Sequence, residues 1–485
     1  MNRTVKVFAL MLCMILLLGF GAVPTSANSV PKFWSGSTGM GAIIADEDCP
    51  IVVENELLTF DIHEFPERDY EQTQDFLEYS AFVTAQYTFY NPADYTIIAT
   101  LVFPFGKLPS YGNGYSFWDS KLGMYVNVND TDKYDITING NVIEKTLRHT
   151  LMPTGASFEL EEDLGRLCDG YIDDPFFRSD MPVTKYTYSI SGIDDEYDAA
   201  NAAFDLAKFD GKTKLLFMEL RGTHVQKNKS CRISAWVKNG SNLTLYAIGE
   251  PLNGDPQWKF YENGGVKDKE EIEGSATLVS TEEMTFEEFV LKAYVEESDI
   301  LASDWYNAMV MDLNRNESKY GVVSRSDSGF DLSHSLMRWY EYEITLAPGE
   351  RLVNAVTAPM YPSIDGYWDP NVYDYTYLLS PAQKWSEFGS LEIVINTPFF
   401  VTESSLGDFE KTDSGYRLVR DGLPSGELKF SLCSVENPKK DSNWSSILFL
   451  IIFIGSPIII IVGVIFLIVF GIVCLIRGIK SKKRI

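Results

Sequence analysis

Histidine is scarce in this sequence, and the common catalytic motifs are missing from it. The chain holds only four histidines, and none lies in an H-E-x-x-H motif or at helical spacing from a second one. A G-x-S-x-G elbow, a P-loop and a glycine-rich dinucleotide fingerprint are missing as well. We therefore expect no cofactor and no chemistry that depends on these motifs. A serine triad or a carboxylate pair assembled from distant residues stays open. The histidines are His63, His149, His224 and His334.

Basic residues are also few. The chain has 41 Lys and Arg against 68 Asp and Glu, a formal net charge of −27. Seven of the basic residues and none of the acidic ones lie in residues 1–27 and 447–485, so the segment between these ends carries a charge of about −34. Such a surface disfavours nucleic acid and anionic lipid as partners, because both are polyanions. It favours a cation, a basic partner, or a well-solvated surface that has no specific partner.

Only six cysteines are present, and two of them lie in the apolar ends. The absence of a C-x-x-C pair leaves a zinc or redox motif unsupported. An oxidising compartment permits two disulfides among the remaining four cysteines, in three possible pairings that spacing does not distinguish. These disulfide candidates are Cys49, Cys168, Cys231 and Cys433.

Long apolar runs occur only at the two ends of the chain. Residues 1–27 have a basic start, an apolar stretch and small residues at Thr25 and Ala27, the pattern of a secretory signal peptide that is cleaved after Ala27. A retained signal anchor is the alternative. Near the other end, residues 447–476 contain no charged residue, and a bilayer core needs only about 20 apolar residues. We therefore predict one transmembrane helix.

The residues that flank this run set its orientation. The tail at 477–485 is basic, so the positive-inside rule places it in the cytoplasm and the rest of the chain outside the cell. Its last four residues also fit a dilysine retrieval pattern, although an ordinary stop-transfer tail explains them. The linker at 434–446 is short, which keeps the preceding domain close to the membrane.

Strand patterns dominate residues 28–150, the predicted N-terminal β-sandwich domain. Ser80 to Tyr90 alternates with a period of two, which is typical of a half-buried strand. A turn then leads to a returning strand at Tyr95 to Phe103. Asn139 and Gly140 suit a type I′ turn between two further strands.

Residues 151–335 are expected to be a mixed α/β region with helical insertions. Helices are predicted at Asp194 to Lys208, which is rich in alanine, and at Thr285 to Tyr294 and Ser298 to Leu313. The last helix has a core-facing stripe. The residues of this stripe are Leu301, Trp305, Ala308 and Met309.

Alternation resumes in residues 336–433, the predicted second β-sandwich domain. Trp339 to Leu346 alternates and ends in a Pro-Gly turn, and five further apolar runs read as strands. The predicted fold class is therefore mainly β with helical insertions, as two β-sandwich-like domains plus one C-terminal transmembrane helix.

Four motifs carry a family resemblance, two in each predicted sandwich. They are Tyr87-x-Phe89-Tyr90-Asn91-Pro92, Val102-Phe103-Pro104-Phe105, Tyr340-x-Tyr342-x-Ile344-x-Leu346-x-Pro348-Gly349-Glu350, and Tyr375-Thr376-Tyr377-Leu378-Leu379-Ser380-Pro381-Ala382-x-x-Trp385. With them the chain resembles uncharacterised bacterial exported and surface proteins. The first two motifs, together with the Asn139-Gly140 hairpin, are also similar, more distantly, to the VIT (vault/inter-α-trypsin) β-sandwich domain, over roughly Ile51 to His149. The resemblance implies a sandwich and no particular chemistry. No metal-dependent adhesion site of the von Willebrand A domains, which often accompany VIT domains, is taken over from the resemblance.

Two groups of residues are candidate sites. The first is rich in the hard oxygen ligands that Ca²⁺ prefers, although a solvated turn also explains it. It consists of Asn127, Asn129, Asp130, Asp132 and Asp135. The second is the aromatic set Tyr367, Trp368 and Trp385, whose flat rings suit a glycan or protein ligand. A single buried strand face explains the neighbouring Tyr373, Tyr375 and Tyr377 instead.

These observations favour a single-pass extracellular β-sandwich protein with a binding or envelope-structural role. A protein or glycan partner outside the cell fits such a role. The alternatives are an ectohydrolase that uses carboxylates, and an accessory subunit of a membrane complex. Gly455, Gly463 and Gly471 would form the packing face of such a subunit.

Overall fold

The computed structural model describes most of the chain between Phe33 and Lys440. The described residues are 33–34, 38–40, 42–44, 49–65, 81–106, 116–119, 124–127, 133–152, 160–197, 199–206, 211–217, 220–225, 231–262, 271–296, 299–324, 332 and 336–440. Strands dominate these residues and helices are few, which confirms the mainly β class. No helix within these ranges is long and apolar enough to cross a membrane. The predicted signal peptide at 1–27 and apolar run at 447–476 lie outside the described residues.

The main body of the protein is built from three sheets that share one core. The largest has the strand order β10-β9-β23-β5-β4-β27-β30-β29. Its strands are β4 (Val52–Asp61), β5 (Ala81–Tyr90), β9 (Asp135–Ile138), β10 (Asn141–Val142), β23 (Arg351–Met360), β27 (Glu387–Asn396), β29 (Glu410–Lys411) and β30 (Gly415–Asp421). Burial alternates strictly along β5, which confirms the period-two prediction for this strand.

The two other sheets of the main body are smaller. One has the order β11-β22-β6-β3 and contains β3 (Ile43–Ile44), β6 (Ile97–Gly106), β11 (Thr146–Leu151) and β22 (Leu336–Leu346). The other has the order β1-β24-β26-β31-β28, with β2 beside β26. It contains β1 (Phe33–Trp34), β2 (Thr38–Met40), β24 (Ser363–Asp365), β26 (Val372–Leu378), β28 (Phe400–Ser404) and β31 (Leu428–Cys433). Two further sheets have two strands each: β7 (Ser116–Asp119) with β8 (Met124–Asn127), and β25 (Trp368–Asp369) with β32 (Lys439–Lys440). A 3₁₀ helix, η4 (Ser380–Lys384), follows β26.

The division into separate sandwiches at 28–150 and 336–433 is wrong, because the strands of the two segments pair with one another. β23 pairs with β5 over ten positions, β27 runs parallel to β4, and β22 pairs with β6. One hydrophobic core contains residues of both segments. Local alternation marks a strand but does not identify its partner across the sheet, so the pattern could not show this long-range pairing.

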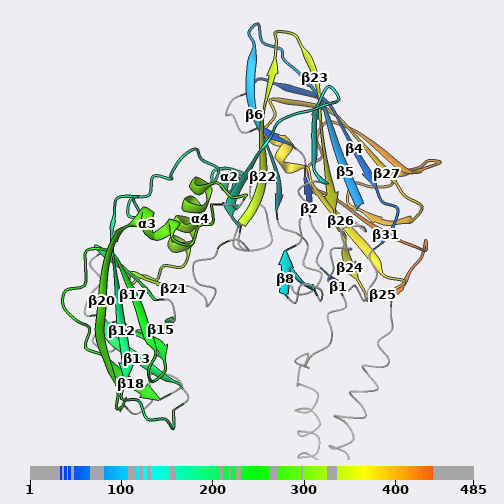
Figure 1. The fold of residues 1–485 in the computed structure, drawn as a ribbon. Coiled ribbons are helices and arrows are strands. Elements are labelled where there is room, and N and C mark those ends of the chain that lie inside the picture. The colour runs from blue at the N-terminus through cyan, green and yellow to red at the C-terminus, as the bar shows by residue number, and fades with distance from the viewer. Residues whose placement is uncertain are drawn as a thin grey trace, which may run out of the picture.

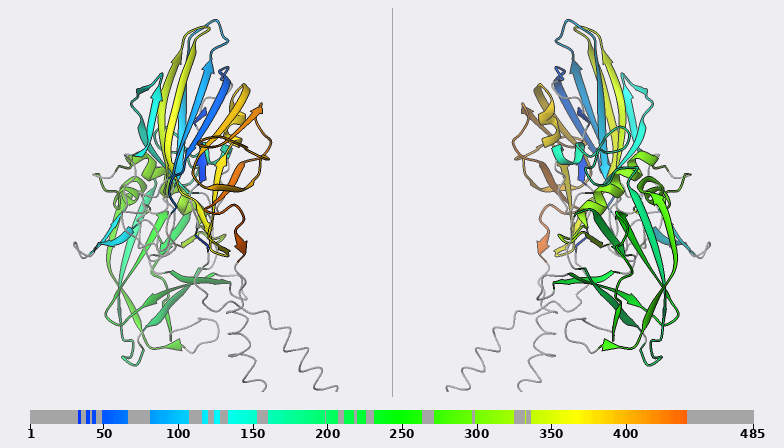
Figure 2. Two further views of the ribbon diagram at one scale, coloured as in Figure 1. Left: turned by 90° about the vertical axis from the view of Figure 1, so that its right-hand side faces the viewer. Right: turned by 90° about the vertical axis from the view of Figure 1, so that its left-hand side faces the viewer.

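The middle of the chain forms an inserted body with two five-stranded sheets, seen at the lower left of Figure 1 and from two further sides in Figure 2. Their orders are β20-β12-β17-β14-β21 and β15-β16-β13-β18-β19. The strands are β12 (Pro182–Ser191), β13 (Ala200–Leu206), β14 (Thr213–Phe217), β15 (Leu220–Val225), β16 (Cys231–Val237), β17 (Asn242–Gly249), β18 (Lys259–Glu262), β19 (Glu271–Ile272), β20 (Ser275–Thr285) and β21 (Val322–Ser324). Helices α3 (Phe286–Leu291) and α4 (Ala302–Arg315) lie on the side toward the main body, near the short helix α2 (Leu160–Leu164).

Two expectations for this region need correction. The alanine-rich segment predicted as a helix at Asp194 to Lys208 contains strand β13, which lies between β16 and β18. Tertiary pairing overrides the helix propensity of alanine here, because these small side chains fit into the closely packed core. Helix α4 exists where it was expected and buries Trp305, Ala308 and Met309. Leu301 is not part of this stripe, since it caps the helix and is 41% exposed.

Candidate functional site

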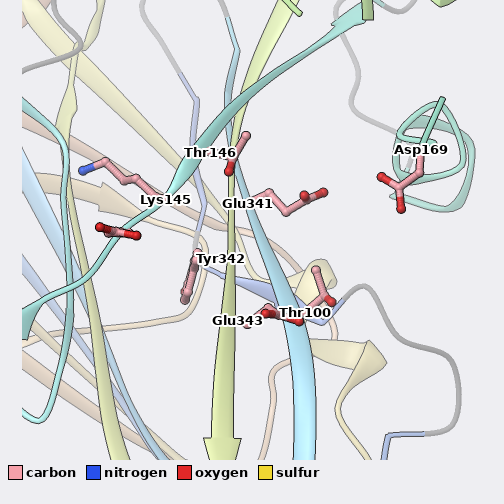
Figure 3. Close-up of a pocket in the computed structure, with 8 residues that line it drawn as sticks. Thr100, Lys145, Thr146, Asp169, Glu341, Tyr342 and Glu343 are labelled. Carbon is pink, nitrogen blue, oxygen red and sulfur yellow. The ribbon is translucent and has the colours of Figure 1, made fainter. Parts of the chain in front are cut away.

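A polar hollow of about 620 Å³ lies on the outer face of the sheet formed by β11, β22 and β6 (Figure 3). A second hollow of about 200 Å³ adjoins it and shares Thr100, Asp169 and Glu341 with it. We call the larger one the acidic hollow. It is lined by Thr100, Glu144, Lys145, Thr146, Asp169, Glu341, Tyr342 and Glu343.

The pleat of β22 places two carboxylates on this face. Glu341 and Glu343 point outward, whereas Tyr342 between them turns into the core and is 3% exposed. The register sets Thr146 of β11 opposite Glu341 and Thr100 of β6 opposite Glu343. Small hydroxyl side chains on both neighbouring strands therefore leave room above the two acids.

The far wall of the acidic hollow comes from the segment that follows α2. Asp169 is exposed there, and Figure 3 shows its carboxylate and that of Glu341 pointing toward one another. Glu144 contributes a further exposed carboxylate just before β11. Acids of three separate parts of the chain thus converge on one space.

Arg148 of β11 forms the buried base of the second hollow. Its Nε donates to Oδ1 and Oδ2 of Asp304 in α4 at 3.3 and 3.2 Å, and its Nη1 donates to Oε2 of Glu341 at 2.8 Å. Its Nη2 donates to the carbonyl of Cys168 at 2.8 Å, and Asp169 lies 3.6 Å from Nη1. Burial alone would lower the pKa of Arg148, but the hydrogen bonds and ion pairs, first of all with Asp304, raise it. The guanidinium is therefore a fixed part of the fold.

His149, the next residue, is buried and uncharged. Its backbone N–H donates to Oδ2 of Asp304 at 2.8 Å, whereas its Nδ1 has no hydrogen-bond partner. Burial, followed by the positive charges of Arg338 and Arg148, lowers the pKa of His149 to about 4. The imidazole therefore adds no positive charge to this region at neutral pH.

Lys145 is the one cation among the residues that line the acidic hollow, and it is bound to the wall. Its Nζ donates to the carbonyl of Tyr134 at 2.8 Å and lies 4.7 Å from the ring centroid of Tyr340. Burial lowers the pKa of Lys145, and the nearby charge of Asp135 opposes this effect. Glu144, Asp169, Glu341, Glu343 and Asp304 together outnumber the two bases, so the site is negative.

No three His, Cys, Asp or Glu side chains among the described residues are grouped to hold a metal ion. The predicted calcium ligands Asn129, Asp130 and Asp132 lie outside those residues. Of the other two, Asn127 ends β8 and Asp135 is the exposed first residue of β9. The calcium site at 127–135 stays a prediction.

The predicted aromatic ligand set is separated by the fold. Trp385 is 5% exposed, and its ring packs 4.6 Å from Phe89 and 6.4 Å from Tyr87, so it is a core residue and cannot meet a surface ligand. Tyr367 and Trp368 lie together at an edge of the main body, and Tyr367 is 40% exposed. The tyrosines of β26 are buried, which confirms their assignment to one strand face.

The four disulfide candidates lie in different parts of the fold. Cys231 begins β16 in the core of the inserted body, and Cys49 packs on the core of the main body. Cys168 and Cys433 are free thiols. Cys168 accepts a hydrogen bond from Nδ2 of Asn307 at 3.1 Å. The structure therefore does not support a disulfide that includes Cys168 or Cys433.

No known motif marks the acidic hollow, although part of its signal is visible in the sequence. Glu341 and Glu343 alternate with Tyr340 and Tyr342, which indicates one charged and one buried face. Arg148 stands out as a charged residue within a strand. Their convergence with Asp169 depends on long-range pairing that the pattern does not contain.

No protein-family model matches this chain, and no curated protein is significantly similar to it. Among solved structures, a Legionella pneumophila protein provisionally described as a nutrient binding protein aligns with 82% of this chain and 72% of its own length. The identity is 9% and the TM-score is 0.32. A likeness at this level carries no argument, so the candidate site rests on its own geometry.

Proposed function

We propose that this chain is an exported, membrane-tethered binding protein and that its acidic hollow takes an organic cation with more than one ammonium group. The observation that carries the proposal is the convergence of Glu144, Asp169, Glu341 and Glu343 on a space of about 620 Å³. This volume lies within the range typical of small-molecule sites. The predicted signal peptide and apolar run supply the exterior location and the tether.

The arrangement of charges supports an extended cation over a single metal ion. Glu343 and Glu341 lie two positions apart on one strand face, and Asp169 faces Glu341 from the opposite wall. An ion with one centre cannot contact carboxylates spread in this way, whereas a chain of spaced ammonium groups meets them one after another. The hydroxyl groups of Thr100 and Thr146 add neutral acceptors between the acids.

The test is calorimetric titration of the full chain in phosphatidylcholine nanodiscs with spermidine, a linear triamine, as the probe. We expect binding that weakens as salt rises, because partly exposed charges are screened. Glu343→Gln should weaken it about tenfold, the effect of losing one charge-assisted hydrogen bond. Glu387→Gln is the matched control, since Glu387 is an exposed strand acid of β27 outside the acidic hollow.

Two results would count against the proposal. One is the absence of any heat of binding at low salt. The other is equal weakening by Glu343→Gln and Glu387→Gln, which would mean that the probe responds to the overall negative charge and not to the acidic hollow.

A further inference from the structure

The edge of the main body that precedes the predicted membrane anchor carries aromatic and lysine side chains. β25 pairs with β32, so that Trp368 lies opposite Lys440, whose Nζ is 5.8 Å from the Trp368 ring centroid. Tyr367 is 40% exposed and Val435 is 38% exposed, and Lys439 is exposed as well. We call these five residues the anchor edge.

This edge is fixed to the rest of the main body by hydrogen bonds. The thiol of Cys433, at the end of β31, donates to the carbonyls of Pro370 at 3.7 Å and Asn371 at 3.4 Å. The backbone N–H of Tyr367 donates to Oδ1 of Asp365 in β24 at 2.9 Å. The Trp368 ring is therefore carried by a paired strand, and the Tyr367 ring by the turn that precedes this strand.

The length of chain beyond Lys440 limits how far this edge can lie from a bilayer. The uncharged run starts at Ile447, and seven residue steps span at most about 25 Å even when fully extended. Figure 1 shows β24 and β25 at the end of the main body opposite to β23's upper tip. The edge is thus the part of the main body that is closest along the chain to the predicted anchor.

We infer that the anchor edge rests in the headgroup layer of a zwitterionic bilayer; this inference depends on the proposed tether. Tryptophan and tyrosine favour that layer because their rings are apolar at one end and polar at the other. Lysine reaches from it toward water and phosphate. Anionic lipid adds no attraction, because acids neighbour the two lysines. These acids are Asp365, Asp369 and Glu436.

The shape of the molecule sets the angle of this contact. Figures 1 and 2 show the inserted body extending past β25 and β32 in the same direction. The bilayer plane is therefore oblique to the strands of the main body.

Tryptophan quenching by lipids tests the contact on the full chain in phosphatidylcholine vesicles. Lipids brominated on upper acyl carbons quench rings that lie in the interface. Trp368→Phe should remove one tryptophan's share of the quenched signal among the nine tryptophans of the chain. Trp385→Phe is the matched control, because Trp385 is buried in the main body, and it should leave the quenched amplitude unchanged. Adding phosphatidylglycerol should not increase the Trp368 share.

Flotation of the vesicles separates the two proposals. If the chain fails to float with the vesicles, the tether is wrong and the inference falls with it. If the chain floats but Trp368→Phe and the parent protein are quenched equally, the tether stands and the anchor edge does not touch lipid. If the Trp368 share grows with phosphatidylglycerol, the contact is electrostatic and the zwitterionic surface is wrong.

Discussion

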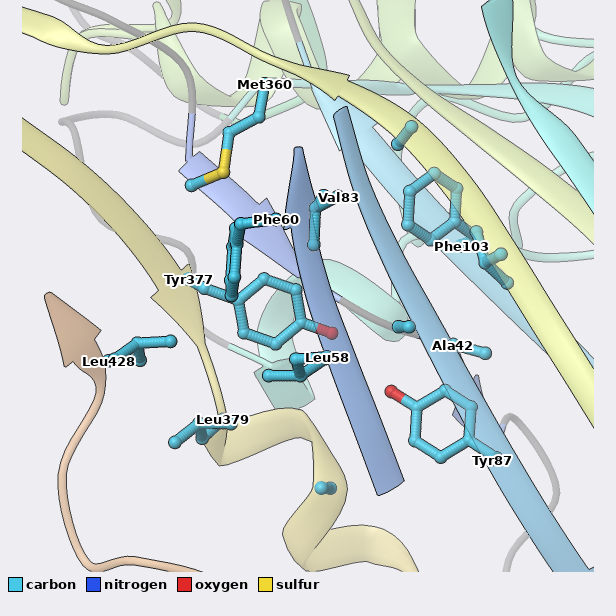
Figure 4. Close-up of a cluster of buried hydrophobic side chains, with 14 of the residues drawn as sticks. Ala42, Leu58, Phe60, Val83, Tyr87, Phe103, Met360, Tyr377, Leu379 and Leu428 are labelled. Carbon is cyan, nitrogen blue, oxygen red and sulfur yellow. The ribbon is translucent and has the colours of Figure 1, made fainter. Parts of the chain in front are cut away.

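The carboxyl group of Glu56 is buried in the core of the main body, and this predicts an unusual dependence of stability on pH. Glu56 is 1% exposed and points inward from β4 between Tyr87 of β5 and Tyr377 of β26. The Tyr377 hydroxyl donates to Oε1 at 3.3 Å, whereas Oε2 has no hydrogen-bond partner. Figure 4 shows the two tyrosine hydroxyls pointing toward one another within the apolar cluster. Burial raises the pKa of Glu56 to about 7, although hydrogen bonds from both tyrosines oppose this rise.

The direction in which the free energy of unfolding changes with pH follows from proton binding. In the unfolded chain Glu56 has its ordinary pKa of 4.5, so between about 4.5 and 7 the folded state holds a proton that the unfolded state has lost. The free energy of unfolding therefore falls as pH rises through this window and is constant with respect to Glu56 above it. At 1.36 kcal/mol for each pKa unit, the change amounts to at most about 3 kcal/mol. Glu56→Gln is neutral at every pH and should lack this fall.

Urea unfolding of the full chain in nanodiscs at pH 5, 6, 7 and 8 measures the effect. The other carboxylates titrate equally in both proteins, so the difference between variant and parent isolates Glu56. We expect this difference to shift in favour of Glu56→Gln by about 2.5 kcal/mol between pH 5 and pH 8, since part of the window lies below pH 5. Glu54→Gln is the control, because Glu54 lies on the same strand but pairs at the surface with Arg351. Parallel curves for Glu56→Gln and the parent, or a shift in the opposite direction, would refute the reasoning.

Two further predictions concern stability and are checked by the same unfolding measurement. Arg148→Met should lower the free energy of unfolding by about 3–5 kcal/mol, because it leaves Asp304 buried without its partner. Adding Asp304→Asn to this variant should recover part of that loss. If the losses of the two single variants simply add in the double variant, the pairing is contradicted. Gly389→Ala should lower the free energy of unfolding by about 1–3 kcal/mol. Its new Cβ would lie 2.3 Å from the carbonyl oxygen of Glu54, across the parallel pair of β27 and β4. Gly426→Ala is the control for the second change, since a Cβ there meets nothing within 4 Å, and an equal cost at both glycines would contradict the steric argument.

The strands of this protein could be predicted from the sequence where one face of a sheet is buried. β5 and β22 alternate cleanly between apolar and polar residues, and both lie where the pattern placed them. β13 could not be predicted, because its alanines favour a helix in isolation and its strand conformation depends on β16 and β18. Local sequence patterns thus identify strands that have one buried and one exposed face. They fail where pairing with distant strands determines the conformation.

The candidate site was less accessible to prediction than the fold. Tyr367 and Trp368 were singled out by residue type, and the structure does leave Tyr367 exposed, but Trp385 carries the same type of side chain and is buried. Residue type does not report burial for aromatic side chains, because they occur both in cores and at surfaces. The acidic hollow is lined by common residue types, which form a candidate site only because the fold brings them together.

The connection between the two bodies explains why this convergence occurs where it does. β11 and β22 are neighbours that pair Leu151 with Leu336, so the chain leaves the main body and returns to it at one point. The inserted body therefore interrupts a single set of sheets, and α4 reaches back to β11 through the buried pair of Arg148 and Asp304. Removal of either partner would leave an uncompensated buried charge, so this pair ties the stem of the insertion to the main body. Glu341 of the main body and Asp169 of the insertion share Arg148 on this stem. The acidic hollow therefore depends on the insertion, because its walls need residues of both the main body and the insertion.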